Sequence, residues 1–117
     1  MLLIGALGLD VGPALAAGDA ERGQNLYESR CFGCHSLDSN RIGPMHRGVF
    51  GRKVGTAAGF DYSPALRGSA VVWGEDTLER WLTNPQDLIA GQRMNFRVAL
   101  KEDRADIIAF LKRESGK

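Results

Sequence analysis

Cys31-Phe32-Gly33-Cys34-His35 is the stretch of this 117-residue sequence that decides the fold. Its pattern, Cys-x-x-Cys-His, is the signature of covalent attachment of a c-type haem. Two thiols three positions apart at the end of a helix can each add to one vinyl group, and the adjacent imidazole can then ligate the iron. The motif therefore predicts one covalently bound haem c, attached through Cys31 and Cys34, with His35 as an axial ligand.

Other sites built on two cysteines fit the sequence less well. A redox-active dithiol normally lies in a thioredoxin-like βαβ unit, and the sequence predicts no strands. A structural disulfide is the second alternative, since disulfides are common in exported proteins. A zinc site needs four ligands, but outside the motif the chain has no cysteine and a single histidine, His46. We prefer the haem and keep the dithiol and the disulfide as alternatives.

Residues 1–17 differ in composition from the rest of the chain. They read MLLIGALGLDVGPALAA and carry one charged residue, Asp10, within an apolar run too short to span a bilayer. Ala14-Leu15-Ala16 fits the small-x-small pattern of a signal-peptidase site. We predict a cleaved signal peptide at 1–17, one domain at 18–117 and a periplasmic location. A membrane anchor or a disordered tail is the alternative, because no Lys or Arg precedes the apolar run.

Composition limits the classes of function. The chain is 44% hydrophobic and 25% charged, as is usual for a globular domain, and its length leaves room for one domain. A net charge of +1 does not suit a nucleic-acid-binding protein or a polybasic membrane-surface protein. We therefore expect that the protein binds no nucleic acid and that its mature part does not insert stably into a membrane. We also expect a monomer.

Hydrophobic periodicity predicts helices and no strands. Short helices are expected over residues 19–30 and 75–83, and a longer one over 101–113, where acidic residues begin the helix and basic residues end it. Between Gly43 and Gly74 the density of Gly and Pro excludes long regular elements. A loop of this length in a small domain needs something other than secondary structure to hold it in place. A large apolar haem in the core would do so, because the loop could pack against it.

The second axial ligand is expected to be Met94. Besides the initiator, the sequence has two methionines, Met45 and Met94. Met45 follows His35 too closely, whereas Met94 lies in a polar strap long enough to reach the opposite haem face. A methionine usually fills core space, which explains Met94 less well between Arg93 and Asn95. Ligation by histidine and a thioether raises the reduction potential and leaves no open position on the iron.

From Gly18 to Arg113 the chain resembles the class I cytochromes c of the mitochondrial and alphaproteobacterial type. Short segments in family order carry the resemblance together with the haem motif: Gly43-Pro44, Gly48-Val49-Phe50-Gly51-Arg52-Lys53, Gly59-Phe60-Asp61-Tyr62, Trp73-Gly74-Glu75-Asp76-Thr77-Leu78, Asn84-Pro85 and Arg104-Ala105-Asp106-Ile107-Ile108-Ala109-Phe110-Leu111. The resemblance implies an all-α cytochrome c fold of three to five short helices and long loops, wrapped around one haem.

The resemblance also implies roles for the haem surroundings. Cys31 and Cys34 would be the thioether anchors, and His35 and Met94 the axial ligands. The Pro44 carbonyl would accept a hydrogen bond from the His35 ring N–H. Tyr62 and Trp73 would form hydrogen bonds with a haem propionate, and Arg52 would offset the charge of that propionate. Phe96 would shield the methionine side of the haem. Gly23 and Tyr27 resemble positions that meet Ile107 and Phe110 where the first and last helices cross.

Three residues depart from the family pattern. Trp81 stands where the family usually has a tyrosine whose hydroxyl reaches the ligating sulfur, and Gln92 replaces a threonine. These changes should alter the reduction potential. His46 replaces a leucine near the haem, as a neutral core residue with one satisfied nitrogen or as a titrating group that couples the potential to pH.

By resemblance, the protein is a soluble electron carrier and not an enzyme, with no catalytic residue. Its partners would be a quinol-oxidising complex, an oxidase or a periplasmic dehydrogenase, which dock on the haem edge. The family usually has a ring of lysines around this edge, and here the cations at the edge are Arg30, Arg93, Arg97 and Arg41. Electrostatic steering to an acidic partner should therefore be weaker than is usual in the family. Alternatives are a haem peroxidase or ligand-binding sensor with a labile Met94, and an electron-accepting subunit bound to one dehydrogenase.

Overall fold

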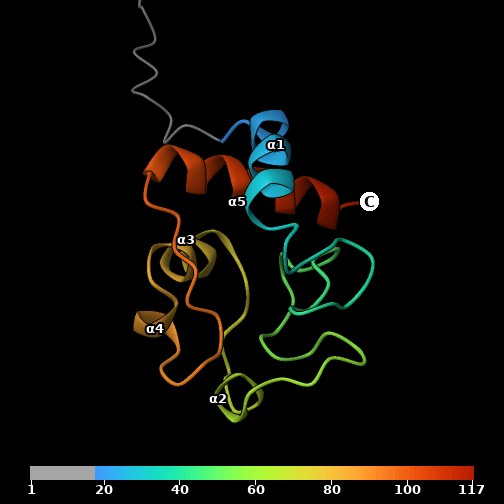
Figure 1. Ribbon diagram of the computed structural model, residues 1–117, viewed down its shortest axis with the longest axis vertical. Helices are drawn as coiled ribbons and strands as arrows, with labels where there is room; N and C mark the ends of the chain where they lie inside the picture. The colour runs from blue at the N-terminus through green and yellow to red at the C-terminus, as the bar shows by residue number, and fades with distance from the viewer. Residues whose placement is uncertain (1–17) are drawn as a thin grey trace, which may run out of the picture.

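The protein is all-α, with helices joined by long loops. The computed structural model describes residues 18–117, so the signal peptide predicted for residues 1–17 lies outside the described residues. The helices are α1 (Ala20–Arg30), α2 (Pro64–Arg67), α3 (Glu75–Thr83), α4 (Pro85–Leu88) and α5 (Lys101–Ser115). Figure 1 shows α1 lying across α5, with α3 and α4 below them and α2 at the far end. This arrangement confirms the predicted fold class.

The three helices expected from periodicity are present. α1 begins at Ala20, one residue later than predicted, because Asp19 is its N-cap and its side chain accepts the N–H groups of Glu21 and Arg22. α3 has the predicted bounds, 75–83, and its apolar stripe is buried. α5 continues two residues beyond the predicted end, to Ser115, whose hydroxyl donates to the Leu111 carbonyl at 2.7 Å.

Two further helices, α2 and α4, have four residues each and were not predicted individually. Each begins with a proline at its first position, where the missing N–H costs no hydrogen bond. Ser63 caps α2 and Asn84 caps α4, each through a side-chain oxygen that accepts a backbone N–H. One helical turn shows no hydrophobic periodicity, so local capping alone defines these elements.

The glycine-rich region between residues 43 and 74 folds back on itself. A single antiparallel bridge pairs Lys53 with Val72, and the Trp73 N–H donates to the Arg52 carbonyl at 2.9 Å. Gly55 has a φ of +76°, and a Cβ there would lie 2.5 Å from the Leu66 carbonyl oxygen. Only glycine suits this close approach. The fold-back places Arg52 and Trp73 side by side.

The crossing of α1 over α5 depends on Gly23. A Cβ at this position would lie 1.8 Å from the carbonyl oxygen of Asp106 and 3.0 Å from the Cβ of Phe110. One turn further on, the rings of Tyr27 and Phe110 lie 5.1 Å apart. The structure therefore places Gly23 and Tyr27 against α5, as the resemblance implied. No helix within residues 18–117 has both the length and the apolar character needed to cross a bilayer.

Buried carboxylates on α5 also hold α1. The Asp103 side chain is 1% exposed and pairs with Arg22 at 2.7 Å and with Arg30 at 2.9 Å. Asp106 accepts the Asp19 N–H at 2.7 Å and pairs with the second guanidinium nitrogen of Arg22 at 2.5 Å. The hydrogen bond from Arg22 is the main cause that holds the pKa of Asp103 below its ordinary value, with Arg30 adding to it against the opposing effect of burial.

The Asp103 network should make stability depend on pH. Because the pKa of Asp103 is lower in the folded than in the unfolded chain, its contribution is present above the unfolded pKa, about 4, and is lost as the pH falls through the folded value. We expect Asp103→Asn to lower the melting temperature of the haem-loaded protein at pH 7. The melting temperature of this variant should also fall less than that of the native protein as the pH is lowered. Thermal unfolding from neutral to acid pH measures both.

Asp87→Asn is the matched control for Asp103, because Asp87 is exposed and forms no ion pair with any residue in 18–117. Asp87→Asn should leave the pH dependence of the melting temperature as in the native protein. An Asp103→Asn protein with the native acid dependence would contradict the prediction.

Candidate functional site

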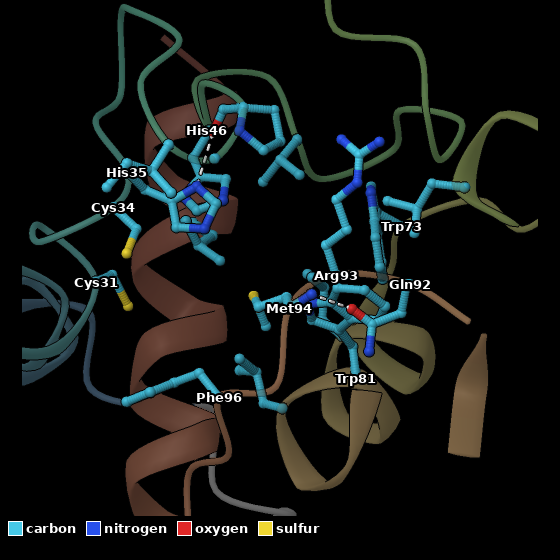
Figure 2. Close-up of a pocket in the computed structure, with 18 of the residues that line it drawn as sticks. Cys31, Cys34, His35, His46, Trp73, Trp81, Gln92, Arg93, Met94 and Phe96 are labelled. Carbon is cyan, nitrogen blue, oxygen red and sulfur yellow. Dashed lines mark hydrogen bonds between the residues drawn. The ribbon is translucent and has the colours of Figure 1, made fainter. Parts of the chain in front are cut away.

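A cavity of about 420 Å³ lies in the centre of the fold, and its lining is mostly apolar. Helices α1, α3 and α5 and the loops between them form its walls (Figure 2). All ten residues predicted for the site line this one cavity, although they are spread over most of the chain: Cys31, Cys34, His35, Pro44, Arg52, Tyr62, Trp73, Trp81, Met94 and Phe96. The structure therefore brings these ten residues together around one cavity.

The haem-attachment motif forms a tight turn at the end of α1. Cys31 is the C-cap of the helix, and its carbonyl accepts the N–H groups of Cys34 at 3.1 Å and His35 at 2.9 Å. The turn brings both sulfurs and the His35 ring to the same side of the chain, facing the cavity (Figure 2). Burial raises the pKa of the Cys31 thiol to about 11. In the folded chain this thiol is protonated and a poor nucleophile.

The His35 ring is fixed by the Gly43-Pro44 segment. The Pro44 carbonyl lies 2.9 Å from Nδ1, so Nδ1–H donates to it and Nε2 keeps its lone pair. A Cβ at Gly43 would lie 2.1 Å from Cε1 of the ring, so any side chain at this position would displace it. Burial lowers the pKa of His35, which keeps the ring neutral at neutral pH. A neutral imidazole with a free Nε2 is the form that ligates iron.

Met94 reaches the cavity from the strap that follows α4. Gln86 holds this strap, because its side-chain oxygen accepts the Gly91 N–H at 3.0 Å and its amide donates to the Gln92 carbonyl at 3.2 Å. The Met94 N–H in turn donates to the side-chain oxygen of Gln92. Figure 2 shows the Met94 sulfur directed into the cavity from another element than His35. The strap therefore holds a thioether at the cavity independently of the cysteine motif.

One part of the cavity wall offers hydrogen-bond donors. The Arg52 guanidinium donates to the Met45 carbonyl at 2.9 Å, but its Nε is buried and has no partner among residues 18–117. The side-chain amide nitrogen of Gln92 is likewise buried and unpartnered. Tyr62 accepts the Ala57 N–H at 3.0 Å, which leaves its O–H free to donate. An apolar cavity with unpaired donors suits a large apolar ring that carries carboxylates, such as haem.

The aromatic residues of the site are placed differently from one another. Trp73 and Trp81 are both 8% exposed and pack edge to face, with ring centroids 5.2 Å apart. Phe96 is 44% exposed and lies where the cavity opens to the surface. The tryptophans therefore form a buried wall, whereas Phe96 covers an edge.

Two features of the site could not be found from the sequence. The Gln92 side chain bonds the backbone of Met94, and Tyr27 forms a hydrogen bond of 2.9 Å with His46. One indirect sign of the Tyr27–His46 hydrogen bond was present in the sequence, because both residues are polar and stand at positions expected to be in the core. His46 is partly buried, lines the cavity and has one nitrogen bonded, which is closer to the first of the two alternatives considered.

Comparisons with known proteins agree with this site. The cytochrome c family profile matches residues 20–114. The chain is 44% identical over 106 residues to cytochrome c 2.1 of Caenorhabditis elegans, which covers 88% of this chain and 96% of that protein. It is 45% identical over 98 residues to cytochrome c of Euglena viridis, with 81% and 96% covered.

A solved structure with the same fold is that of cytochrome cH from Methylobacterium extorquens. It superposes with a TM-score of 0.78 at 35% identity and covers 82% of this chain and 99% of that one. The helical fold, the cysteine motif and the matching cavity define a protein with one covalently bound haem c. The chain belongs to the cytochrome c family. Cytochromes c are haem proteins that transfer electrons with redox partners.

Proposed function

We propose that this cytochrome c carries single electrons between redox partners through a haem held by Cys31 and Cys34 and ligated by His35 and Met94. The observation that carries the proposal is that both ligand side chains face one cavity from separate segments of the chain. The haem supplies the redox chemistry, through reversible change of its iron by one electron. Ligation by histidine and thioether raises the potential and closes the iron to substrates, so the protein is a carrier and not an enzyme.

The protein's own residues exclude water and hold the charge of the site. Trp73 and Trp81 form the buried wall, and the unpaired nitrogens of Arg52 and Gln92 would serve as donors to the haem carboxylates. Burial lowers the pKa of Arg52, and a propionate beside it would stabilise its charged form. A site that excludes water and pairs each charge with an opposite one rearranges little when one electron enters or leaves the haem. Little rearrangement suits fast electron transfer.

Partners dock at the exposed edge of the cavity. Ile42 is 76% exposed and lines it together with Phe96, so an apolar patch surrounds the opening. Arg93 and Arg97 are exposed nearby in sequence, whereas Arg30 is partly neutralised by Asp103 at 2.9 Å. A small apolar patch with few cations favours brief contacts with an acidic partner and modest salt dependence. The partner is a quinol-oxidising complex, an oxidase or a dehydrogenase.

A periplasmic location for the mature monomer is part of the proposal. It rests on the leader-like composition of residues 1–17 and on the chemistry of haem attachment, which takes place where the cysteines are kept reduced outside the cytoplasm. Cell fractionation and the N-terminal sequence of the purified protein test it. A mature chain that begins at Ala17 or Gly18 in the periplasmic fraction supports it, and a full-length chain in the cytoplasm contradicts it.

The visible spectrum of the purified protein tests the ligands. We expect the bands of a low-spin c-type haem in both oxidation states, with the weak long-wavelength band of methionine bound to ferric iron. Carbon monoxide added to the reduced protein should change nothing, because both axial positions are taken. Ready binding of carbon monoxide would instead favour the peroxidase or sensor with a labile Met94.

A further inference from the structure

Two polar side chains from different parts of the chain meet beside His35. The Tyr27 hydroxyl of α1 lies 2.9 Å from Nδ1 of His46, which follows Pro44 by two positions. The ring of His46 stacks on the ring of His35 with centroids 4.0 Å apart and an interplanar angle of 24° (Figure 2). A chain of contacts therefore runs from α1 through His46 to the imidazole that is proposed to ligate the iron.

The direction of the hydrogen bond follows from burial. Tyr27 is 1% exposed, and within residues 18–117 its hydroxyl has no other partner than His46. If His46 donated, the Tyr27 O–H would be buried without an acceptor, at a cost of about 1–3 kcal/mol. The Tyr27 O–H therefore donates to Nδ1, and the proton of the neutral imidazole is on Nε2 of His46. This bond fixes both the tautomer and the ring orientation of His46.

The stacked ring of His46 adds a broad planar contact to the other contacts of His35. The Pro44 carbonyl holds Nδ1 at 2.9 Å, and Gly43 lies close to Cε1. The Pro44 carbonyl contacts the edge of the ring. The Gly43 backbone lies against three ring atoms, Cε1, Nδ1 and Nε2, and has no side chain, whereas His46 supplies a stacked planar ring. The orientation of an axial imidazole about its bond to the metal is set by such surrounding contacts. Leucine, the residue implied by the resemblance at this position, has no planar face to stack.

We propose that Tyr27 and His46 are positioning residues for the proximal ligand: the Tyr27 hydroxyl orients His46, and His46 orients the His35 ring by stacking. The inference rests on the proposed ligation of iron by His35. It predicts that the Tyr27 hydroxyl affects the iron through His46 alone. Replacing the hydroxyl should change the signals of the haem only while His46 is present.

Three variants test this coupling: Tyr27→Phe, His46→Leu and the double variant. The readout is the set of paramagnetically shifted haem methyl protons of the oxidised protein, which depends on the orientation of the axial ligands. We expect each single variant to redistribute these shifts, and the double variant to show the pattern of His46→Leu with no further change. Such non-additivity is the signature of one residue acting through another.

Thermal unfolding provides a second readout of the same pair. His46→Leu leaves the Tyr27 O–H buried without an acceptor, so this variant should melt at a lower temperature than the double variant. Adding Tyr27→Phe to His46→Leu should therefore stabilise the protein, although Tyr27→Phe alone destabilises it. This reversal of sign separates a hydrogen-bonded pair from two independent packing residues.

Ser115→Ala is the control for a general loss of stability. It removes a hydroxyl at the end of α5 that accepts the Phe50 N–H at 3.1 Å, and it should leave the methyl shifts as in the native protein. The inference is overturned if Tyr27→Phe leaves the shifts unchanged, or if the effects of the two single variants add. A native protein without low-spin haem signals would overturn the proposed function as well, so the two failures are distinguishable.

Discussion

Met94→Ala is expected to abolish the long-wavelength methionine band and to open the iron to carbon monoxide. The only thioether that faces the cavity within residues 18–117 is lost, and alanine offers no donor atom. Because the thioether stabilises reduced iron, and axial ligands shift haem potentials over a range of about 0.8 V, we expect the midpoint potential to fall by ~0.2 V. Redox titration and the carbon monoxide spectrum measure the two effects.

Met45→Ala is the matched control, since Met45 is half-buried but does not line the cavity. Its contact with Arg52 is made by the backbone carbonyl, which the substitution preserves. The control should keep the native spectrum and remain closed to carbon monoxide. Loss of the methionine band in Met45→Ala, with the band kept in Met94→Ala, would reverse the assignment of the second ligand.

The double variant Cys31→Ala/Cys34→Ala is expected to lose covalent haem completely. If each thiol forms one thioether, as proposed, either single variant should keep haem through the remaining sulfur. Its reduced-state band should be shifted to longer wavelength by the unreacted vinyl group. Haem staining of the denatured chain and its intact mass measure the number of bonds. The double variant should lose all of its haem on extraction with acidified organic solvent.

Ser36→Ala is a suitable control for the cysteine variants because it lies next to the motif and its hydroxyl bonds only within the exposed 36–39 turn. It should keep the full covalent content. Haem that stays attached to the double cysteine variant after denaturation would contradict attachment at Cys31 and Cys34. The disulfide and dithiol alternatives would then return.

Much of the fold was predictable because its main elements leave periodic signals. The stripe in residues 75–83 and the acid-to-base polarity of 101–113 identified α3 and α5. The four-residue helices α2 and α4 left no such signal, since a proline and a capping side chain define each of them. Hydrophobic periodicity indicates which face of a helix is buried, and a helix of a single turn is too short to show a periodic pattern.

The lining of the site was predictable, but its internal bonds were not. Motif and resemblance identified ten of the residues that line the cavity. The Gln92 bond to the Met94 backbone and the stacking of His46 on His35 depend on side-chain orientation, which residue types alone do not specify. Both involve residues that depart from the family pattern. Resemblance is least informative at such positions, and coordinates are most informative there.

The dependence of α1 on α5 also sets the order of events during biogenesis. Arg22 and Gly23 meet Asp103 and Asp106, and the hydrogen bonds between these helices join residues 81–87 positions apart. During synthesis from the N-terminus, contacts of such separation cannot form until α5 has been made. Until then the cysteine motif, at the end of α1, has no α5 to pack against. The cysteine thiols therefore have an interval for haem attachment before the fifteen residues of α5 cover the helix that precedes them.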